Sequence, residues 1–569
     1  MKITRRQALG TIAGGVVAAV GSQGQLQRAS GQAVSPATPA NGASGARDLP
    51  PAPAPIVSPA GFGVAEGPFK PTLESLSAFK VPEWYRDAKF GIWAHWGPQC
   101  QPEQGDWYAI NMYNPKHEIY KFHVEKYGHP SKFGFKDVIH EWKADKWEPE
   151  KLIALYKRAG AKFFASMAHH HDNFDNFNST YQPWNSVNVG PKKDIVGGWM
   201  KAARDAGLRF AISSHGDRAW SWYQAAQGSD PTGPLAGVPY DGIMTKAQGT
   251  GLWWEGLDPQ DLYAQYHKVG SYNWAQSGSP QIDKAFCEKY FNRIIDVIDK
   301  YQPDILYFDD IVMPIYPTSD VGPRIAAYLY NTNLARNGKL EAVMTGKNLN
   351  GANAAWRNAL VFDIENGISG GAEAVPWQTD TCIGSWHYKR DRFIHHTYKT
   401  SLQVVQMLVD IVSKNGNLML SIPVRGEGTI DDDEVKVLEG LADWIAPNGE
   451  GIFATRPFTV YGEGPSTTAA PARAGGPRAP VAVKYTSEDI RFTTKGETLY
   501  AFVLAWPDDG KARIKTLAKG AAAFQRNVGK VELLGVGEVA FTHDESGLTV
   551  TMPDKKPNDF AYALKIQSA

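Results

Sequence analysis

Residues 149–170 read PEKLIALYKRAGAKFFASMAHH and hold one full repeat of the expected fold. Residues 149–160 place apolar side chains at helical spacing and end at a glycine, so they predict an amphipathic helix. Residues 162–170 form a short apolar run that ends in histidines, which is typical of a buried strand with a polar tip. A helix that leads through a turn into such a strand is the unit of a parallel β/α fold.

The same pattern occurs elsewhere in the chain. Strands are expected at 89–97, 162–170, 209–217, 304–310, 359–367 and 417–424, and helices at 149–160, 196–207, 284–301 and 432–453, the last stopped by Gly449. Repeated over roughly 350 residues with polar groups at strand ends, this pattern favours an α/β fold of the (β/α)8-like TIM barrel type over a doubly wound sheet.

Four segments of different character are expected. Residues 1–24 contain paired arginines before a short glycine-rich apolar run, which resembles a twin-arginine signal peptide; an ordinary secretion signal is the alternative. Residues 25–68 are rich in Pro, Ala and Ser and predict a disordered linker. Residues 69–460 carry the barrel pattern, and residues 461–569 carry alternating runs that predict an antiparallel β-sandwich.

Composition narrows the classes of function. The chain has 569 residues with 59 basic and 59 acidic side chains, which offers no electrostatic argument for nucleic acid or an anionic membrane. The 18 Trp and 24 Tyr favour carbohydrate handling, because aromatic rings stack on sugars; a Trp-rich core is the alternative. The three cysteines are scattered, so they indicate neither a disulfide framework nor a thiolate metal site, and a single disulfide stays open.

Polar residues follow each expected strand. Residues 220–280 are too long and too rich in Gly and Pro for a simple connection and predict an active-site loop. Asp309 follows a fully apolar run and would be presented at the barrel mouth, where paired carboxylates perform glycoside hydrolysis. Helix capping is the alternative role, for which Asp310 is the natural candidate. The residues at the strand ends are His95, Trp96, His169, His170, His171, His215, Asp309, Asp310, Asp363 and Glu365.

Several motifs in order carry a family resemblance. They are FGIWAHWG (90–97), GDWYAINMY (105–113), AHHHDNFDNFNSTYQPWN (168–185), DILYFDD (304–310), PWQTDTCIGSWHY (376–388) and GNLMLSIPVRGEGTI (416–430). Over roughly residues 80 to 460 the chain resembles glycoside hydrolase family 29, the α-L-fucosidases. The resemblance implies a retaining exo-glycosidase with a barrel, a C-terminal β-sandwich, no metal and no cofactor.

The resemblance also implies roles for individual residues. Asp309 matches the nucleophile. Asp106 stands where the family commonly has Glu, so it would keep a hydroxyl contact with a shorter reach. The residues expected to bind substrate are His95, Trp96, Asp106, Trp107, His170, His171, Trp184, Trp377 and Trp386.

The chain departs from the family pattern at Gln378. Many members have Glu there as the acid/base, and a glutamine cannot donate a catalytic proton. Glu365, at the tip of an expected strand, is the preferred acid/base, with Glu373 and Asp380 as alternates. Loss of hydrolysis is the remaining alternative.

The three consecutive histidines also raise a metal hypothesis. Adjacent residues on an extended segment point to opposite faces, so one ion would not take both His170 and His171, and no HxH pair occurs at the first strand. Each neutral imidazole supplies one donor and one acceptor, which suits sugar hydroxyls. We therefore expect His170 and His171 to bind substrate, no role for His169, and no metal; histidines satisfied in the core are the alternative.

The sequence thus predicts hydrolysis of terminal α-L-fucosyl linkages in a fucosylated oligosaccharide or glycoconjugate. The paired arginines predict a periplasmic or secreted location, with no nucleic-acid or membrane partner, and the oligomeric state stays open. The alternatives are an exo-α-L-galactosidase on the same scaffold, a non-catalytic carbohydrate-binding protein and a metal-dependent hydrolase.

Overall fold

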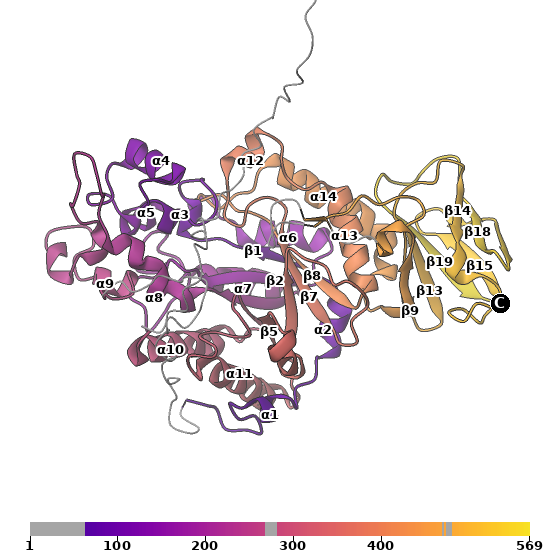
Figure 1. The fold of residues 1–569 in the computed structure, drawn as a ribbon, viewed down its shortest axis with the longest axis horizontal. Helices are drawn as coiled ribbons and strands as arrows, with labels where there is room; N and C mark the ends of the chain where they lie inside the picture. The colour runs from indigo at the N-terminus through magenta and orange to yellow at the C-terminus, as the bar shows by residue number, and fades with distance from the viewer. Residues whose placement is uncertain (1–62, 268–281, 469–471, 474–480) are drawn as a thin grey trace, which may run out of the picture. The chain divides into compact units, whose positions relative to one another are not determined.

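The computed structural model describes residues 63–267, 282–468, 472–473 and 481–569. Eight parallel strands close into a barrel in chain order, and β1 is hydrogen-bonded to both β2 and β8 (Figure 1). The predicted (β/α)8-like barrel is confirmed. The strands are β1 (Phe90–Ala94), β2 (Phe163–His169), β3 (Arg209–Ser214), β4 (Ile305–Phe308), β5 (Val343–Lys347), β6 (Val361–Glu365), β7 (Trp377–Cys382) and β8 (Gly416–Ser421).

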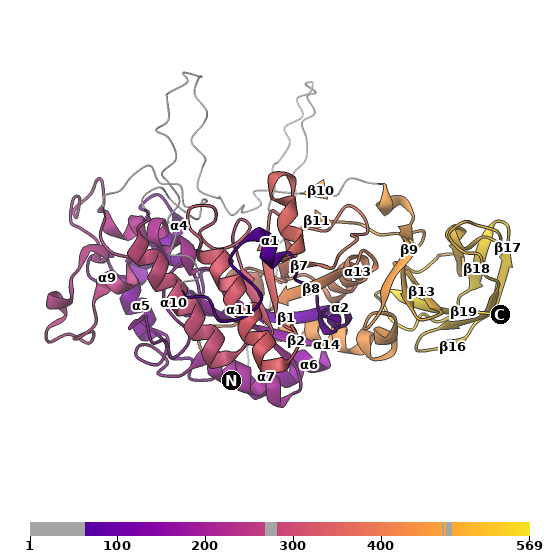
Figure 2. The same ribbon diagram turned by 90° about the horizontal axis from the view of Figure 1, so that it is seen from below.

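The four predicted helices are present with nearly the expected bounds. They are α6 (Pro149–Arg158), α7 (Ile195–Asp205), α10 (Lys284–Tyr301) and α14 (Asp432–Asn448), which Gly449 follows as its cap. Two long helices were not predicted: α11 (Val321–Asn337), which packs beside α10 (Figure 2), and α13 (Ser401–Ser413). The shorter helices are α1 (Leu73–Leu76), α2 (Glu83–Ala88), α3 (Tyr108–Asn111), α4 (Glu118–Tyr127), α5 (Phe135–Glu141), α8 (Ala219–Trp222), α9 (Pro259–Leu262) and α12 (Arg390–Ile394).

The turn between α6 and β2 shows why this repeat needs a glycine. Gly160 has φ 101°, a conformation that a side chain disfavours. A Cβ at this position would also lie 2.5 Å from Ile445 Cδ1 on α14. The positive φ of Gly160 turns the chain toward the buried strand β2, and the absence of a side chain lets α14 approach closely.

Two barrel strands, β5 and β7, were missed by the sequence prediction. β7 reads WQTDTC, yet all six of its residues are buried. Its polar side chains are satisfied inside the barrel: Gln378 Nε2 donates to Asp363 Oδ1 (2.8 Å), and Tyr85 Oη donates to Gln378 Oε1 (2.9 Å). Buried polar groups that bond to each other leave no apolar pattern to detect.

The C-terminal region forms the predicted β-sandwich. A six-stranded sheet of order β16-β15-β19-β13-β12-β9 and a three-stranded sheet of order β14-β18-β17 enclose a core that includes Phe492, Val531 and Leu548. Trp444 Nε1 on α14 donates to Ala561 O (2.8 Å), and the buried Arg491 on β12 pairs with Asp410 on α13. The strands are β9 (Arg456–Glu463), β12 (Ile490–Lys495), β13 (Thr498–Val503), β14 (Lys511–Ile514), β15 (Val528–Leu533), β16 (Gly537–Glu538), β17 (Phe541–Asp544), β18 (Gly547–Thr551) and β19 (Tyr562–Ser568); a separate pair is β10 (Ala472–Arg473) and β11 (Val481–Ala482).

Some predictions fall partly outside the described residues. The signal segment and nearly all of the linker do so, while Ala65 near the linker's end accepts a hydrogen bond from Asn331 on α11 (2.8 Å). The three cysteines are buried and free. Within the described ranges, no helix is both long and apolar enough to cross a membrane.

Candidate active site

The carboxyl ends of the barrel strands bring histidines and carboxylates together. Five histidines, from the ends of β1, β2 and β3 and from the loop after β7, form what we call the histidine cage. Their exposed fractions are 4% or less, so the cage is buried. The cage consists of His95, His170, His171, His215 and His387.

Three rings of the cage stand nearly perpendicular to one another. The ring centroids of His95, His170 and His387 lie 4.6 to 5.0 Å apart, at interplanar angles of 71° to 87°. His215 stacks on His170 at 4.9 Å, and Trp222 on α8 lies 5.7 Å from His171. The beginning of the predicted active-site loop therefore contacts the cage, while residues 268–281 of that loop lie outside the described residues.

Burial keeps the rings of His95 and His170 uncharged. Burial, and then neighbouring rings, hold the pKa of His95 and of His170 well below the usual range. Among the described residues, neither ring nitrogen of His95 has a hydrogen-bond partner, and the same holds for Nε2 of His215. Buried polar atoms without a partner are costly, so these nitrogens indicate a polar ligand.

The geometric argument against joint action of His170 and His171 was wrong. Their ring centroids lie only 4.4 Å apart, because β2 ends at His169 and the next two residues enter a turn instead of continuing the strand. In each of two histidine trios, one ring nitrogen from every member lies within 4.8 Å of the other two, so either trio could hold a metal ion. They are His95, His170 and His387, and His170, His171 and His215.

His169 belongs to the core. Its Nδ1 lies 3.0 Å from Asp175 Oδ1, its Nε2 lies 2.7 Å from Ser214 Oγ, and its side chain is fully buried. These contacts give it a structural place and leave no atom for a substrate.

Beside the cage, four carboxylates surround one buried lysine, Lys347, the last residue of β5. Its Nζ lies 3.0 Å from Asp309 Oδ1 and 3.3 Å from Glu365 Oε2. It also lies 3.3 Å from Asp380 Oδ2 and 3.6 Å from Asp363 Oδ2. We call this group the carboxylate cluster. His215 Nδ1, 3.5 Å from Asp309 Oδ2, joins the cluster to the cage.

The charges of the cluster are set by Lys347. Burial raises the pKa of Asp309, but Lys347, followed by His215 and Arg218, outweighs burial and holds that pKa well below the usual range. Burial and the neighbouring Asp380 instead raise the pKa of Asp363 well above the usual range. Asp309 is therefore ionised at neutral pH, whereas burial and Asp380 favour the protonated form of Asp363.

The three candidate acid/base residues lie in different surroundings. Glu365 ends β6 at the mouth, with its side chain 24% exposed. Asp380 is buried in the middle of β7 and accepts from Tyr307 Oη (3.0 Å). Glu373 pairs with Arg357 (2.9 Å), and its backbone N–H donates to Lys414 O, next to the start of β8. Of the three, Glu365 is the one that is both partly exposed and in contact with Lys347 beside Asp309.

The surroundings of Gln378 show what the departure from the family pattern changes. It lies second in β7 and bonds inside the barrel to Tyr85 and Asp363. A glutamate there would add another buried carboxylate beside Asp363. The side chain does not face the mouth, so its replacement leaves the histidine cage and Lys347 in place.

Three predicted substrate-binding residues flank the cage. Asp106 Oδ1 accepts from the backbone N–H of His387 (2.7 Å) and lies 3.5 Å from its Nδ1. The ring of Trp386 lies 5.7 Å from that of His95. Trp107 caps α3 in the left-handed conformation with φ 63° and is half-buried. Asp106 and Trp386 thus contact the cage, and Trp107 follows Asp106 directly in the chain.

Three predicted tryptophans lie elsewhere, and the structure corrects their placement. Trp96 packs against Trp142, Trp147 and Trp199, and its Nε1 donates to Arg425 O (2.9 Å). Trp184 Nε1 donates to Asp258 O, and Trp377, the first residue of β7, donates to Lys414 O. All three are at most 1% exposed, so they are core residues.

Lys347 and His387 were missed by the sequence prediction. Lys347 ends a strand that was not predicted. His387 lies in GSWHY, a motif that was used only for its tryptophan. A lysine directly after a short apolar run, and a histidine beside a predicted binding residue, were the available signals.

Comparisons with known proteins agree over nearly the whole chain. A family model described as "Alpha-L-fucosidase" matches residues 59–450, and one described as "Alpha-L-fucosidase C-terminal domain" matches residues 484–567. The tissue α-L-fucosidase of Rattus norvegicus is 25% identical over 521 residues, which cover 89% of this chain and 94% of that protein. The plasma α-L-fucosidase of Homo sapiens is 26% identical over 514 residues, covering 88% and 92%.

Solved structures show the same fold. The structure of Thermotoga maritima α-fucosidase in complex with fucose has a TM-score of 0.62 at 24% identity, and covers 88% of this chain and 100% of that one. The family model spans well over half of the chain, so the resemblance seen in the motifs is confirmed. The chain belongs to the α-L-fucosidase family of glycoside hydrolases.

Proposed function

We propose that the chain hydrolyses terminal α-L-fucosyl linkages of glycans with retention of anomeric configuration. The observation that carries this proposal is the contact of Lys347 with both Asp309 and Glu365 beside the histidine cage. The two carboxylate oxygens cannot be further apart than the sum of these contacts, which is below the ~6.5 Å at which the inverting range begins. That spacing supports a covalent mechanism.

In the first half of the reaction, Asp309 acts as nucleophile. Its carboxylate oxygen forms an ester bond to the anomeric carbon while the bond from that carbon to the leaving oxygen breaks. Glu365 donates its proton to the leaving oxygen. In the second half, Glu365 takes a proton from water, the water oxygen attacks the anomeric carbon, and the ester bond to Asp309 breaks.

Lys347 supports the first half through charge, because before attack it holds Asp309 ionised. Its Nζ also lies 3.3 Å from the carboxylate of Glu365, the proposed base of the second half.

The histidine cage is proposed to hold the sugar hydroxyls. A hydroxyl both donates and accepts, and each neutral imidazole offers one donor and one acceptor. The two ring nitrogens of His95 and the Nε2 of His215 supply such positions, and the other nitrogen of His215 lies 3.5 Å from Asp309.

The test is a panel of aryl glycosides with NMR of the first-formed product. Release from the α-L-fucoside as α-L-fucose supports the proposal, whereas faster release from the α-L-galactoside reassigns the sugar. Release from no glycoside would favour the non-catalytic alternative.

A variant tests the nucleophile. In Asp309→Ala we expect a loss of activity of roughly 10⁴-fold, with azide restoring turnover and giving the β-configured fucosyl azide. Normal activity would reject Asp309 as nucleophile.

We also propose, from the sequence alone, export by the twin-arginine route. Arg5 and Arg6 carry that proposal. Replacing both by lysine in the full-length chain should retain the enzyme in the cytoplasm, while unchanged export would favour the ordinary secretion signal.

A further inference from the structure

A buried glutamine stands directly behind the histidine cage. Gln99 lies in the 3-10 turn η1 (Pro98–Cys100) after β1 and is 0% exposed. Its Nε2 lies 2.9 Å from His170 Nδ1, and its Oε1 lies 3.3 Å from the backbone nitrogen of Ala109. The amide thus touches a fixed donor on one side and a histidine of undetermined tautomer on the other.

These contacts decide which way the amide faces. The backbone N–H of Ala109 can only donate, so the oxygen of Gln99 must face it. The NH₂ group therefore faces His170, and the Nδ1 of His170 must accept.

We propose that Gln99 is a specificity-determining residue that locks His170 as an Nε2–H donor, so that the cage receives hydroxyl oxygen and excludes transition metals. A neutral imidazole carries one proton, and an accepting Nδ1 places it on Nε2. His171 has the opposite tautomer, because its Nδ1 donates to His215 O and its Nε2 keeps the lone pair. The two neighbours thus offer a donor and an acceptor.

The same tautomer of His170 would keep a metal ion out of both histidine trios. Both trios able to gather around an ion include His170. A metal needs the lone pair of its ligand nitrogen, and a ligating histidine donates its other N–H to an acceptor. With the Gln99 NH₂ group on Nδ1, His170 has no acceptor there and no lone pair on Nε2.

The first test reads the tautomer in the wild-type chain. With ¹⁵N-labelled histidine, and His170→Asn to assign the signals, we expect His170 to show a protonated Nε2 and a bare Nδ1 by NMR. In Gln99→Met, which removes the amide at similar length, the two nitrogens should move toward averaged shifts. A wild-type His170 protonated on Nδ1, or no change in Gln99→Met, would overturn the proposal.

The second test reverses the lock. In Gln99→Glu a carboxylate oxygen faces Nδ1, so the proton moves there and Nε2 gains its lone pair. Cobalt(II) should then bind with a tetrahedral absorption spectrum, at an affinity about 10- to 100-fold above wild type. The double variant Gln99→Glu, His170→Ala should lose this binding, and His395→Ala, on an exposed histidine, should keep wild-type behaviour.

Equal cobalt binding by the wild type and the folded Gln99→Glu variant would contradict the proposal. The tautomer and the metal readouts do not depend on hydrolysis. The consequence that Gln99→Met raises KM for an aryl fucoside more than it lowers kcat rests on the proposed function, so a failure of that function would leave the NMR and cobalt results intact.

Discussion

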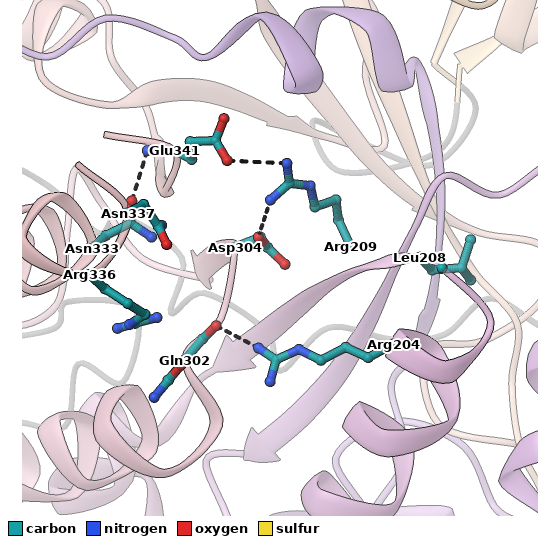
Figure 3. A pocket seen from close by; sticks show the side chains of 10 residues that line it. Arg204, Leu208, Arg209, Gln302, Asp304, Asn333, Arg336, Asn337 and Glu341 are labelled. Atoms are coloured by element: carbon teal, nitrogen blue, oxygen red, sulfur yellow. Dashed lines mark hydrogen bonds and ion pairs between the residues drawn. The ribbon is translucent and has the colours of Figure 1, made fainter. Parts of the chain in front are cut away.

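Two polar regions lie at opposite ends of the same barrel strands. At the base, a hollow of about 360 Å³ is lined by three arginines, two acids and several amides (Figure 3). Arg209 bridges Asp304 (2.8 Å) and Glu341 (3.2 Å), and Arg204 donates to the backbone carbonyls of Tyr301 and Gln302. At the mouth, by contrast, buried histidine nitrogens have no partner among the described residues.

The difference teaches that charge alone does not identify a functional site. Arg204 and Arg209 use their donors on residues at the end of α10 and just before β4 and β5, which is a structural role typical of that end of a barrel. The mouth keeps neutral hydrogen-bonding groups buried and unsatisfied next to an ionised carboxylate. Such a combination is costly for stability and needs a ligand to complete it.

Removing the proposed proton donor should lower activity more than the other substitutions discussed below. In Glu365→Ala we expect kcat/KM for an unactivated fucoside to fall about 10²- to 10⁴-fold. The fall should be smaller for an aryl fucoside whose leaving group needs no proton. Steady-state kinetics on the two substrates measure the contrast. Glu373→Ala is the matched control, and a larger loss in that variant would transfer the role to Glu373.

Removing the central lysine should shift the pH dependence. In Lys347→Met, Asp309 loses the ammonium that lowers its pKa, so the carboxylate protonates at a higher pH and the acidic limb of kcat/KM moves upward. Activity at the new optimum should also fall, by roughly 10²-fold, because the developing charge has lost its partner. Lys347→Arg should keep the acidic limb low. An unmoved limb in Lys347→Met would show that Lys347 does not set the charge of Asp309.

The sequence was informative where a pattern has one physical cause. Apolar runs with polar tips located His95, His170 and Asp309, because a buried parallel strand must surface at its carboxyl end. β7 could not be found in this way, since its polar residues are buried and satisfied by partners on other elements. Lys347 was missed because its strand, β5, was not predicted.

The tryptophans show a different limit. Motif resemblance identified Trp96, Trp184 and Trp377 as members of the right segments but did not tell which residues face the mouth. Each indole N–H is bonded to a backbone carbonyl in the core. The proposed tautomer of His170 likewise depends on Gln99 and Ala109, whose contact arises only when α3 lies against the turn that follows β1.

At the base, substitution should change stability and leave catalysis alone. In Arg209→Met we expect the free energy of unfolding to fall by about 1 kcal/mol, since a side chain that is 39% exposed makes ion pairs weakened by solvent. The urea midpoint should drop while kcat and KM for an aryl fucoside stay at wild-type values. A selective rise in KM would mean that the base hollow communicates with the mouth.

The smallest effect is expected at Arg336, which lines the same hollow. Burial, and then the positive charge of Arg204, lower the pKa of Arg336, so the two guanidinium groups repel each other. In Arg336→Ala the free energy of unfolding should change by less than about 0.5 kcal/mol, because an exposed side chain away from special features contributes little. Any gain in stability should shrink as salt is raised, since salt screens exposed charges. Urea unfolding at low and high salt measures this, with Lys339→Ala on a neighbouring exposed charge as the control. A loss of stability well above that limit, independent of salt, would show that Arg336 makes a structural contact comparable with those of Arg209. The contrast between the base and the mouth of the barrel would then rest on the histidine cage alone.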